Sequence, residues 1–462
     1  MRDPVAVWMS LLGEGGELSE PFWNAHARRL HDARLVFGGR LSCPFLRPLF
    51  MDVRDEARQR AACEVIARIG ERIVREAMHD ETLLADFGLS DAERALVEID
   101  PGYEYASTAS RIDSFLLPDS LMFAEYNAES PAGLGYTEVL ADEFAALPIM
   151  ARFRERFVAD TYPLMDARLE ALLASYRDWG GTAAPPRMVI TDFRGVPTWS
   201  EFEILAERFT QRGVPTVIAD PRELEIAGGR LIAAGAPVDL VYRRALINDL
   251  VARPDDTRVL VQAYRDRLAC VANTLRCKIP HKKSFFAVLT DEAHAHRFSP
   301  DERAAIKAHV PWTRVVAERR TTMPPPPGLR QTGSSGAEAD LVTFVRDGRE
   351  RLVLKPADDF GGHGVTLGWE ADAATWESAL QGALAAPPGT WIVQERIPIR
   401  REPFPIVEGP PHRVTTRDML VDCAPYLFRG KVSGFLTRLS SSGLANVTSG
   451  GGQVPVFRVS AR

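Results

Sequence analysis

The most informative stretch of this sequence reads Val353-Leu354-Lys355-Pro356-Ala357-Asp358-Asp359-Phe360-Gly361-Gly362-His363-Gly364-Val365. An apolar run ends in Lys355, two acids follow, and a glycine cluster leads into a second apolar run. This order is typical of a strand, a phosphate-covering loop and a second strand. Glycines let backbone N–H groups approach phosphate oxygens, a lysine neutralises charge, and acids bind Mg²⁺. A plain glycine turn between two strands stays an alternative.

The composition of the whole chain is that of an ordinary globular protein. Its 462 residues allow about two to four domains, with 45% apolar and 26% charged residues. The net charge of −6 argues against a dedicated nucleic-acid partner. The N-terminus lacks a signal-peptide pattern, and no uncharged apolar run approaches the roughly 20 residues that span a bilayer. We therefore expect a cytoplasmic protein with no nucleic-acid or membrane partner.

The cysteines give no sign of a disulfide framework or a zinc site. They are odd in number, scattered, and never arranged as Cys-x-x-Cys. Each is expected to be a small buried apolar residue, with a lone catalytic thiol as the alternative. They are Cys43, Cys63, Cys270, Cys277 and Cys423.

The pattern of apolar residues changes along the sequence and predicts a mixed α/β (α+β) fold with four successive regions. The first is expected to be a helical N-terminal region, because its apolar residues between positions 55 and 78 recur at helical spacing. The second starts with a strand and continues with helices, and the third alternates short strands and a helix as a βαβ unit on a parallel sheet. The fourth carries the glycine-rich stretch. The predicted regions are 1–104, 105–180, 181–278 and 279–462.

Individual elements can be placed within these regions. The segment 121–127 is expected to be a strand, and a helical region is expected at about 137–178. An amphipathic helix is predicted at 199–212, where Gly213 ends it, and another helix at about 372–385.

Three smaller motifs add to the glycine-rich stretch. Glu125 and Asn127 are alternate residues of a predicted strand, so they share one face and could offer two oxygens to Mg²⁺. A solvated strand edge is the alternative for this pair. Lys282-Lys283 precedes an apolar run and is ordinarily read as a surface pair capping a helix. Arg438 is suited to binding a carboxylate with two parallel hydrogen bonds.

In combination these motifs resemble the ATP-grasp enzymes. Their order is unusual, because the Glu125-x-Asn127 strand lies far upstream of Lys355, whereas in the common arrangement it lies near the C-terminus. The order resembles the circularly permuted branch, which includes eukaryotic-type glutathione synthetase and glutathionylspermidine-synthase-like bacterial proteins. The resemblance covers roughly residues 105–460 and leaves the N-terminal region out.

The resemblance implies a site that binds ATP and Mg²⁺, together with a role for each matching residue. The implied metal ligands are Glu125, Asn127 and Asp359. Substrate contacts are implied for Arg111, which opens the motif Arg111-Ile112-Asp113, and for Ser130, Arg244 and Arg438. Lys283 is the best match to the first ATP lysine, with Lys282 as the fallback. The other implied nucleotide contacts are Lys355, Asp358, Gly361, Gly362, His363, Gly364, Gln394, Glu395, Arg396, Ile397 and Asp422.

The activity that the resemblance implies is an ATP-dependent carboxylate–amine ligase. Such an enzyme forms an acyl phosphate and then an amide, releases ADP and phosphate, and closes a lid, here residues 357–364, over the site. Amino acids, peptides and polyamines are the expected small-molecule substrates, and the oligomeric state stays open, with a homodimer among the alternatives. His363 and Ser440 depart from the pattern, since Ser440 stands where glutathione synthetase has a lysine. A phosphotransferase and a non-catalytic nucleotide-binding partner protein therefore remain alternatives.

Overall fold

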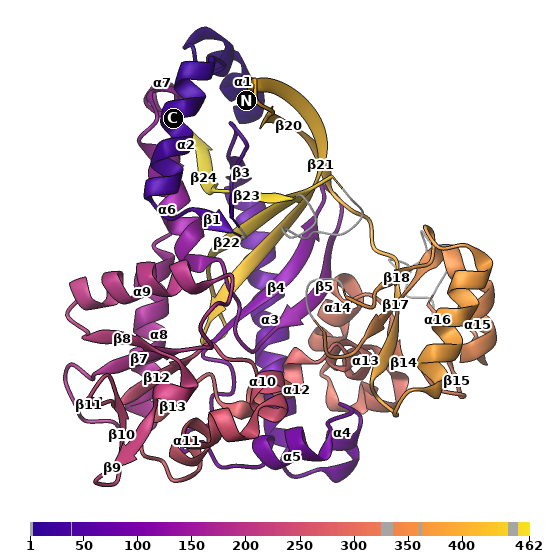
Figure 1. Ribbon diagram of the computed structural model, residues 1–462. Coiled ribbons are helices and arrows are strands. Elements are labelled where there is room, and N and C mark those ends of the chain that lie inside the picture. Colours follow the sequence, from indigo (N-terminus) through magenta and orange to yellow (C-terminus); the bar gives the residue numbers. More distant parts are fainter. Residues whose placement is uncertain (1–2, 38, 325–335, 360–362, 442–450) are drawn as a thin grey trace.

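The computed structural model describes residues 3–37, 39–324, 336–359, 363–441 and 451–462. Figure 1 shows three main sheets: a parallel sheet with its helices, a small antiparallel sheet to the side, and a long antiparallel sheet between them. The long sheet extends towards the region where both chain ends lie. This arrangement confirms the predicted mixed α/β (α+β) class.

The parallel sheet has the strand order β13-β12-β7-β8, and all of its neighbouring strands are parallel. Its central strands are buried along their whole length, as expected where helices cover both faces of a sheet. The helix α9 (Trp199–Gln211) connects β7 to β8 and ends two residues before Gly213, which confirms the predicted βαβ unit. The strands are β7 (Met188–Thr191), β8 (Thr216–Ala219), β12 (Leu240–Arg243) and β13 (Cys270–Ala272).

A hairpin and two helices complete this part of the chain. The hairpin turns at Gly228 and Gly229, whose φ angles of 58° and 73° favour glycine. Its strands form a small three-stranded sheet. The elements are β9 (Glu225–Ala227), β10 (Arg230–Ala233), β11 (Ala236–Pro237), α10 (Ile247–Ala252) and α11 (Pro254–Arg265).

The long antiparallel sheet joins segments from distant parts of the sequence. Its order is β23-β22-β21-β4-β5, and β20 also pairs with β21. β4 pairs with β21 in the register Arg111 to Tyr426. The predicted regions 105–180 and 279–462 therefore share one sheet. The strands are β4 (Ala109–Leu116), β5 (Leu121–Asn127), β20 (Arg401–Glu408), β21 (Arg413–Phe428), β22 (Lys431–Ser440) and β23 (Gly452–Val454).

The small antiparallel sheet contains the glycine-rich stretch and has the order β14-β19-β17-β18. β17 and β18 pair in the register Val353 to Leu367, which confirms the predicted strand, loop and strand. Apolar side chains of α15 and α16 pack on this sheet. The elements are β14 (Thr313–Val315), β17 (Leu352–Pro356), β18 (Thr366–Leu367), β19 (Trp391–Glu395), α15 (Leu341–Asp347), α16 (Ala373–Ala385) and the separate pair β15 (Arg320–Thr322) and β16 (Glu338–Asp340).

The N-terminal region is largely helical, as predicted, but it also contributes strands. The apolar face of α3 packs against β4, β21 and β22, and Gln59 of α3 donates a hydrogen bond of 3.2 Å to the carbonyl of Cys423. The elements of this region are α1 (Pro4–Glu14), α2 (Glu20–Asp32), β1 (Val36–Phe37), β2 (Arg40–Leu41), β3 (Leu49–Asp52), α3 (Val53–Ala77), α4 (Glu81–Ala85) and α5 (Asp91–Val97).

One strand corrects the prediction that residues from about 137 to 178 are helical. The structure divides this stretch into α6 (Leu134–Ala145), α7 (Pro148–Arg154), β6 (Phe157–Asp160) and α8 (Leu164–Asp178). β6 pairs with β24 (Val456–Ala461), which lies between β6 and β3 in a three-stranded sheet. The strand forms because its partner comes from the far end of the chain, which a local pattern does not reveal.

Three further helices, α12 to α14, lie between the parallel sheet and the small sheet. They are α12 (Lys278–His281), α13 (Ser284–Thr290) and α14 (Pro300–His309). Among the described residues, no helix combines the length and apolar character needed to cross a membrane.

Candidate functional site

Lys283 brings together residues that lie far apart in the sequence. Its ammonium lies 3.4 Å from the carboxylate of Glu125 on β5 and donates a 2.6 Å hydrogen bond to the main-chain oxygen of Asp359. Its own backbone N–H donates to the carbonyl of Ala357. The start of α13, the end of β5 and the segment after β17 therefore meet at one place.

The lysine pair lies at the start of a helix, but it is not the exposed surface pair of the ordinary interpretation. Lys282 is buried, and Lys283 occupies the N-cap of α13, where the helix dipole disfavours a cation. Both lysines are held there by acids and carbonyl oxygens of other segments.

Glu125 and Asn127 lie on one face of β5, as the alternation predicted. The amide of Asn127 donates a 3.2 Å hydrogen bond to the carboxylate of Glu125, whose side chain is 29% exposed. Carboxylate and amide oxygens fit Mg²⁺, which also retains water ligands. Within the described part of the chain, no group of three or more His, Cys, Asp or Glu side chains could hold a metal ion. That finding does not apply to Glu125, Asn127 and Asp359, because only two of the three are acids. Their role as Mg²⁺ ligands stays a prediction.

Lys355 on β17 is the second lysine of the site. Its ammonium donates a 2.7 Å hydrogen bond to Gln394 on β19, and Gln394 in turn donates to the hydroxyl of Thr313. Burial and the neighbouring charge of Lys283 lower the pKa of Lys355 to about 8, although Glu125 opposes the shift. Both lysines thus act on the same carboxylate, and Lys355 lies where an anionic ligand would stabilise its charged form.

The segment after Gln394 leaves the small sheet. Glu395 is the last residue of β19, and its N–H donates to the carbonyl of Trp312. Arg396 donates its N–H to Arg351 and lies over the ring of Trp369, with 4.4 Å from guanidinium carbon to ring centre. Ile397 follows, half-buried. The structure does not test the adenine contacts predicted for Gln394, Glu395, Arg396 and Ile397.

Four predicted or neighbouring side chains form an acid–arginine cluster. Arg438 on β22 donates a 2.7 Å hydrogen bond to Asp422 on β21 and also binds Asp113 on β4, while Arg111 donates to Asp113 at 2.8 Å. Burial raises the pKa of Asp422 to about 6, although Arg438 opposes the shift. Burial also opposes ionisation of Asp113, but Arg111 and Arg438 outweigh it and hold the pKa of Asp113 below its usual range.

The loop that follows β5, residues 129–132, is held by two of the predicted substrate arginines. Arg244 donates a 3.1 Å hydrogen bond to the carbonyl of Pro131, and Arg111 donates one of the same length to the carbonyl of Ala132. The hydroxyl of Ser130 is buried without a hydrogen-bond partner among the described residues. The structure therefore brings Ser130, Arg111 and Arg244 together, and the Ser130 hydroxyl is left without a protein partner among the described residues.

The glycine-rich stretch is described only in part. Gly361 and Gly362 lie outside the described residues, whereas His363 and Gly364 are exposed. Gly364 has a φ of 69°, and a Cβ at this position would lie 2.7 Å from the ring of Pro356. The backbone conformation between β17 and β18 therefore requires glycine at position 364, independently of any contact with a ligand.

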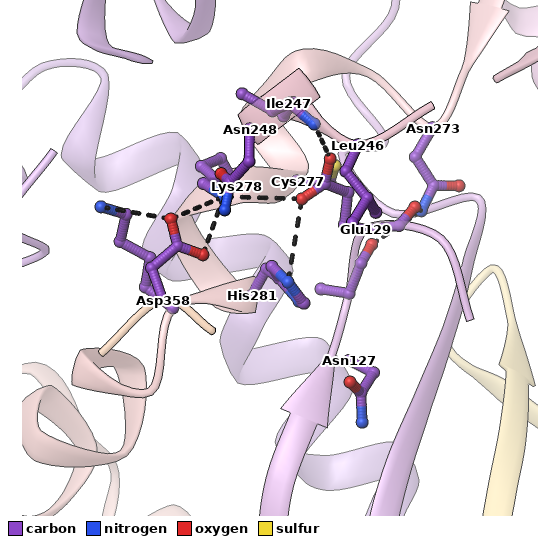
Figure 2. A network of polar contacts seen from close by, with 12 residues as sticks. Asn127, Glu129, Leu246, Ile247, Asn248, Asn273, Cys277, Lys278, His281 and Asp358 are labelled. Atoms are coloured by element: carbon purple, nitrogen blue, oxygen red, sulfur yellow. Dashed lines mark hydrogen bonds and ion pairs between the residues drawn. The ribbon is translucent and has the colours of Figure 1, made fainter. Parts of the chain in front are cut away.

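Asp358 faces a group of residues that the sequence patterns did not reveal. Its carboxylate accepts a hydrogen bond from the ammonium of Lys278, which in turn lies near Glu129 (Figure 2). The same ammonium lies 3.6 Å from Glu93. The predicted nucleotide role of Asp358 stays a prediction. One signal was present in the sequence: Lys278 and Lys282 are four residues apart and so can share a helix face.

Comparison with solved structures finds a similar fold in a glutathione synthetase-like effector from Globodera pallida. The two chains are 12% identical, the match covers 99% of this chain and 98% of the other, and the TM-score is 0.58. A Methylobacillus flagellatus KT protein with the provisional name gamma-glutamylcysteine synthetase is 11% identical, over 83% of this chain and 84% of its own, at a TM-score of 0.39. No family model and no curated protein matches the sequence. The chain therefore has a glutathione synthetase-like fold, a conclusion that rests on the first neighbour and extends to the fold alone.

Proposed function

We propose that this protein is an ATP-dependent carboxylate–amine ligase with a circularly permuted ATP-grasp fold. The observation that carries the proposal is the convergence of two lysines on one carboxylate. Lys283 contacts Glu125 directly, and Lys355 interacts electrostatically with both. Two cations beside a carboxylate and an amide oxygen are the groups that a magnesium-bound triphosphate requires.

The order of the elements supports the permuted arrangement. β5, which carries Glu125 and Asn127, precedes both lysines in the sequence, yet it shares a sheet with β21 and β22 from the C-terminal part. The similarity to a glutathione synthetase-like protein along nearly its whole length agrees with this reading.

The proposed reaction has two steps. A substrate carboxylate attacks the γ-phosphoryl group of ATP, which gives an acyl phosphate and ADP, and an amine then attacks the acyl carbon and expels phosphate. Lys283 and Lys355 stabilise negative charge on the transferred group. Mg²⁺, held by Glu125, Asn127 and Asp359, would add charge neutralisation. The Ser130 hydroxyl and the arginines at 111, 244 and 438 orient the substrate carboxylates.

The cysteines agree with a mechanism that has no covalent enzyme intermediate. All five thiols are free and buried. Burial raises the pKa of Cys43, Cys277 and Cys423 to about 12, and it also raises the pKa of Cys63 and Cys270. A thiol with a raised pKa is a poor nucleophile at neutral pH.

The test is phosphate release from ATP and Mg²⁺ in the presence of a pool of amino acids, peptides and polyamines. The wild-type protein should release phosphate only when substrate is present, and Lys355→Ala should abolish this release. Lys431→Ala, which removes an exposed lysine on β22, is the matched control and should leave it unchanged. Failure of the wild type to bind Mg-ATP would refute the proposal.

Product analysis separates the alternatives. A stable phosphorylated substrate without an amide would indicate a phosphotransferase. Nucleotide binding without turnover, together with co-purification of a second protein, would indicate a non-catalytic partner protein.

A further inference from the structure

Lys278 of α12 occupies the centre of a buried charge network (Figure 2). Its side chain is fully buried, and its ammonium lies 2.8 Å from both carboxylate oxygens of Asp358. It also donates a hydrogen bond to Asn248 of α10 and lies 3.6 Å from Glu93 of α5. A fourth acceptor, Glu129, lies 3.7 Å away. One ammonium thus contacts every predicted region of the chain other than its own.

Glu129 is the unusual member of this network. It is buried, and one of its carboxylate oxygens accepts hydrogen bonds from the guanidinium of Arg243, at 3.1 Å, and from the backbone N–H of Ile247. Its other oxygen, Oε2, has no hydrogen-bond donor among the described residues. The basic groups near that oxygen are the ammonium of Lys278, at 3.7 Å, and the ring of His281, at 3.8 Å; burial lowers the pKa of His281 and so favours its neutral form. An ionised oxygen without a donor is unfavourable in a buried site.

Glu129 also fixes the loop that carries Ser130. It is the first residue of loop 129–132, and its own carbonyl accepts a 2.8 Å hydrogen bond from Asn273. Ser130 is the next residue of the chain, so a displacement of the Glu129 backbone would also displace Ser130.

Asp358 connects the network to the proposed nucleotide site. It lies between Ala357 and Asp359, the two residues whose carbonyl oxygens accept hydrogen bonds from Lys283. Displacement of Asp359 by a ligand bound at Lys283 would thus move the carboxylate of Asp358 relative to Lys278.

Lys278 is the only described cation that pairs with all three acids of the network. Lys282 pairs with Glu93 and Asp358, while Arg243 pairs with Glu129. The charges balance, because three acids face Lys278, Lys282 and Arg243. Among Lys278, Lys282 and Arg243, Lys278 alone pairs both with Asp358 of the glycine-rich stretch and with Glu129 of loop 129–132.

From these contacts we infer that Lys278 is a positioning residue with two hydrogen-bonding arrangements, one to Asp358 and one to Glu129 Oε2. The first is present in this structure. The second, about 1 Å away, gives Glu129 Oε2 the donor that it lacks. Nucleotide bound at Lys283 favours the second arrangement and thereby reorients loop 129–132 for the substrate carboxylate. This inference rests on the proposed function.

Hydrogen exchange of segments 128–135 and 245–250, measured with and without Mg²⁺ and a non-hydrolysable ATP analogue, tests the coupling. In the wild-type protein the analogue should change the exchange rates of both segments by about fivefold or more, the lower range of allosteric coupling. In Glu129→Gln, which keeps the acceptor oxygen for Arg243 and Ile247 but no longer attracts Lys278, that response should disappear while the analogue still binds.

Glu93→Gln is the matched control, because it neutralises another buried acid that pairs with Lys278 and lies off the path to loop 129–132. It should keep the wild-type response. Lys278→Met provides a second variant that should lose the response. If the analogue binds but neither segment responds, or if Glu129→Gln responds like the wild type, the inference is wrong and the proposed function stands. If the wild type binds no analogue, the proposed function is refuted and the inference with it.

Discussion

The proposed nucleotide site predicts that binding depends on pH, because Lys355 titrates in a range that is easily reached. Its ammonium has a pKa of about 8 in the free protein, because burial and Lys283 disfavour its charge. A group with this pKa is roughly 90% protonated at pH 7 and roughly 10% protonated at pH 9. Bound phosphates stabilise the charged form, so at high pH the amine of Lys355 must take up a proton when the nucleotide binds. The dissociation constant for Mg-ADP should therefore rise about tenfold between pH 7 and pH 9, which is about 1.4 kcal/mol.

Calorimetric titrations of Mg-ADP from pH 7 to pH 9.5 measure this effect. Lys355→Arg keeps a full positive charge over the whole range, so its affinity should stay nearly constant. Lys355→Met should bind more weakly at every pH and also lack the tenfold change. An unchanged wild-type affinity between pH 7 and pH 9 would refute the reasoning, and so would a tenfold change that persists in Lys355→Arg.

Three further outcomes are expected from other sites. Glu125→Gln should raise the Mg²⁺ concentration needed for half-maximal nucleotide binding by about tenfold, and binding by the control Lys431→Ala should keep its metal dependence. Gly364→Ala should lower the free energy of unfolding by at least about 1–2 kcal/mol, because residue 364 has a positive φ. Gly382→Ala is the control: this residue lies within α16 with free space around its Cβ position, so alanine should raise the free energy of unfolding by about 0.5–1 kcal/mol. Arg438→Met leaves two buried aspartates without their shared partner and should cost about 3–5 kcal/mol in urea unfolding, against less than about 1 kcal/mol for the half-exposed Arg458→Met.

Local patterns were sufficient to predict many elements of the fold. The βαβ unit follows from short apolar runs separated by an amphipathic helix, and that helix was found within one residue of its predicted range. The shared face of Glu125 and Asn127 follows from the period of a strand, because alternate residues point the same way. Such features depend only on residues close together in the sequence.

Features that depend on distant partners could not be predicted in the same way. β6 exists because β24 pairs with it, and nothing in residues 157–160 identifies that partner. Glu129 and Lys278 are ordinary charged residues in the sequence, and they become a network only when α5, α10 and α12 surround the segment after β17. The expectation that Glu125 and Lys283 belong to one site came from the resemblance to a known family, because their separation in the sequence does not indicate that they are close in space.

The three-stranded sheet β3-β24-β6 has a consequence for synthesis on the ribosome. Its outer strands do not pair with each other, and the middle strand is translated about 400 residues after β3. At about 5–20 residues per second, β3 waits roughly 20–80 s for its partner, and β6, about 300 residues upstream of β24, waits roughly 15–60 s. Unpaired strands are sites of aggregation during that interval. A nascent chain of this protein is therefore expected to depend on chaperones until residues 456–461 emerge.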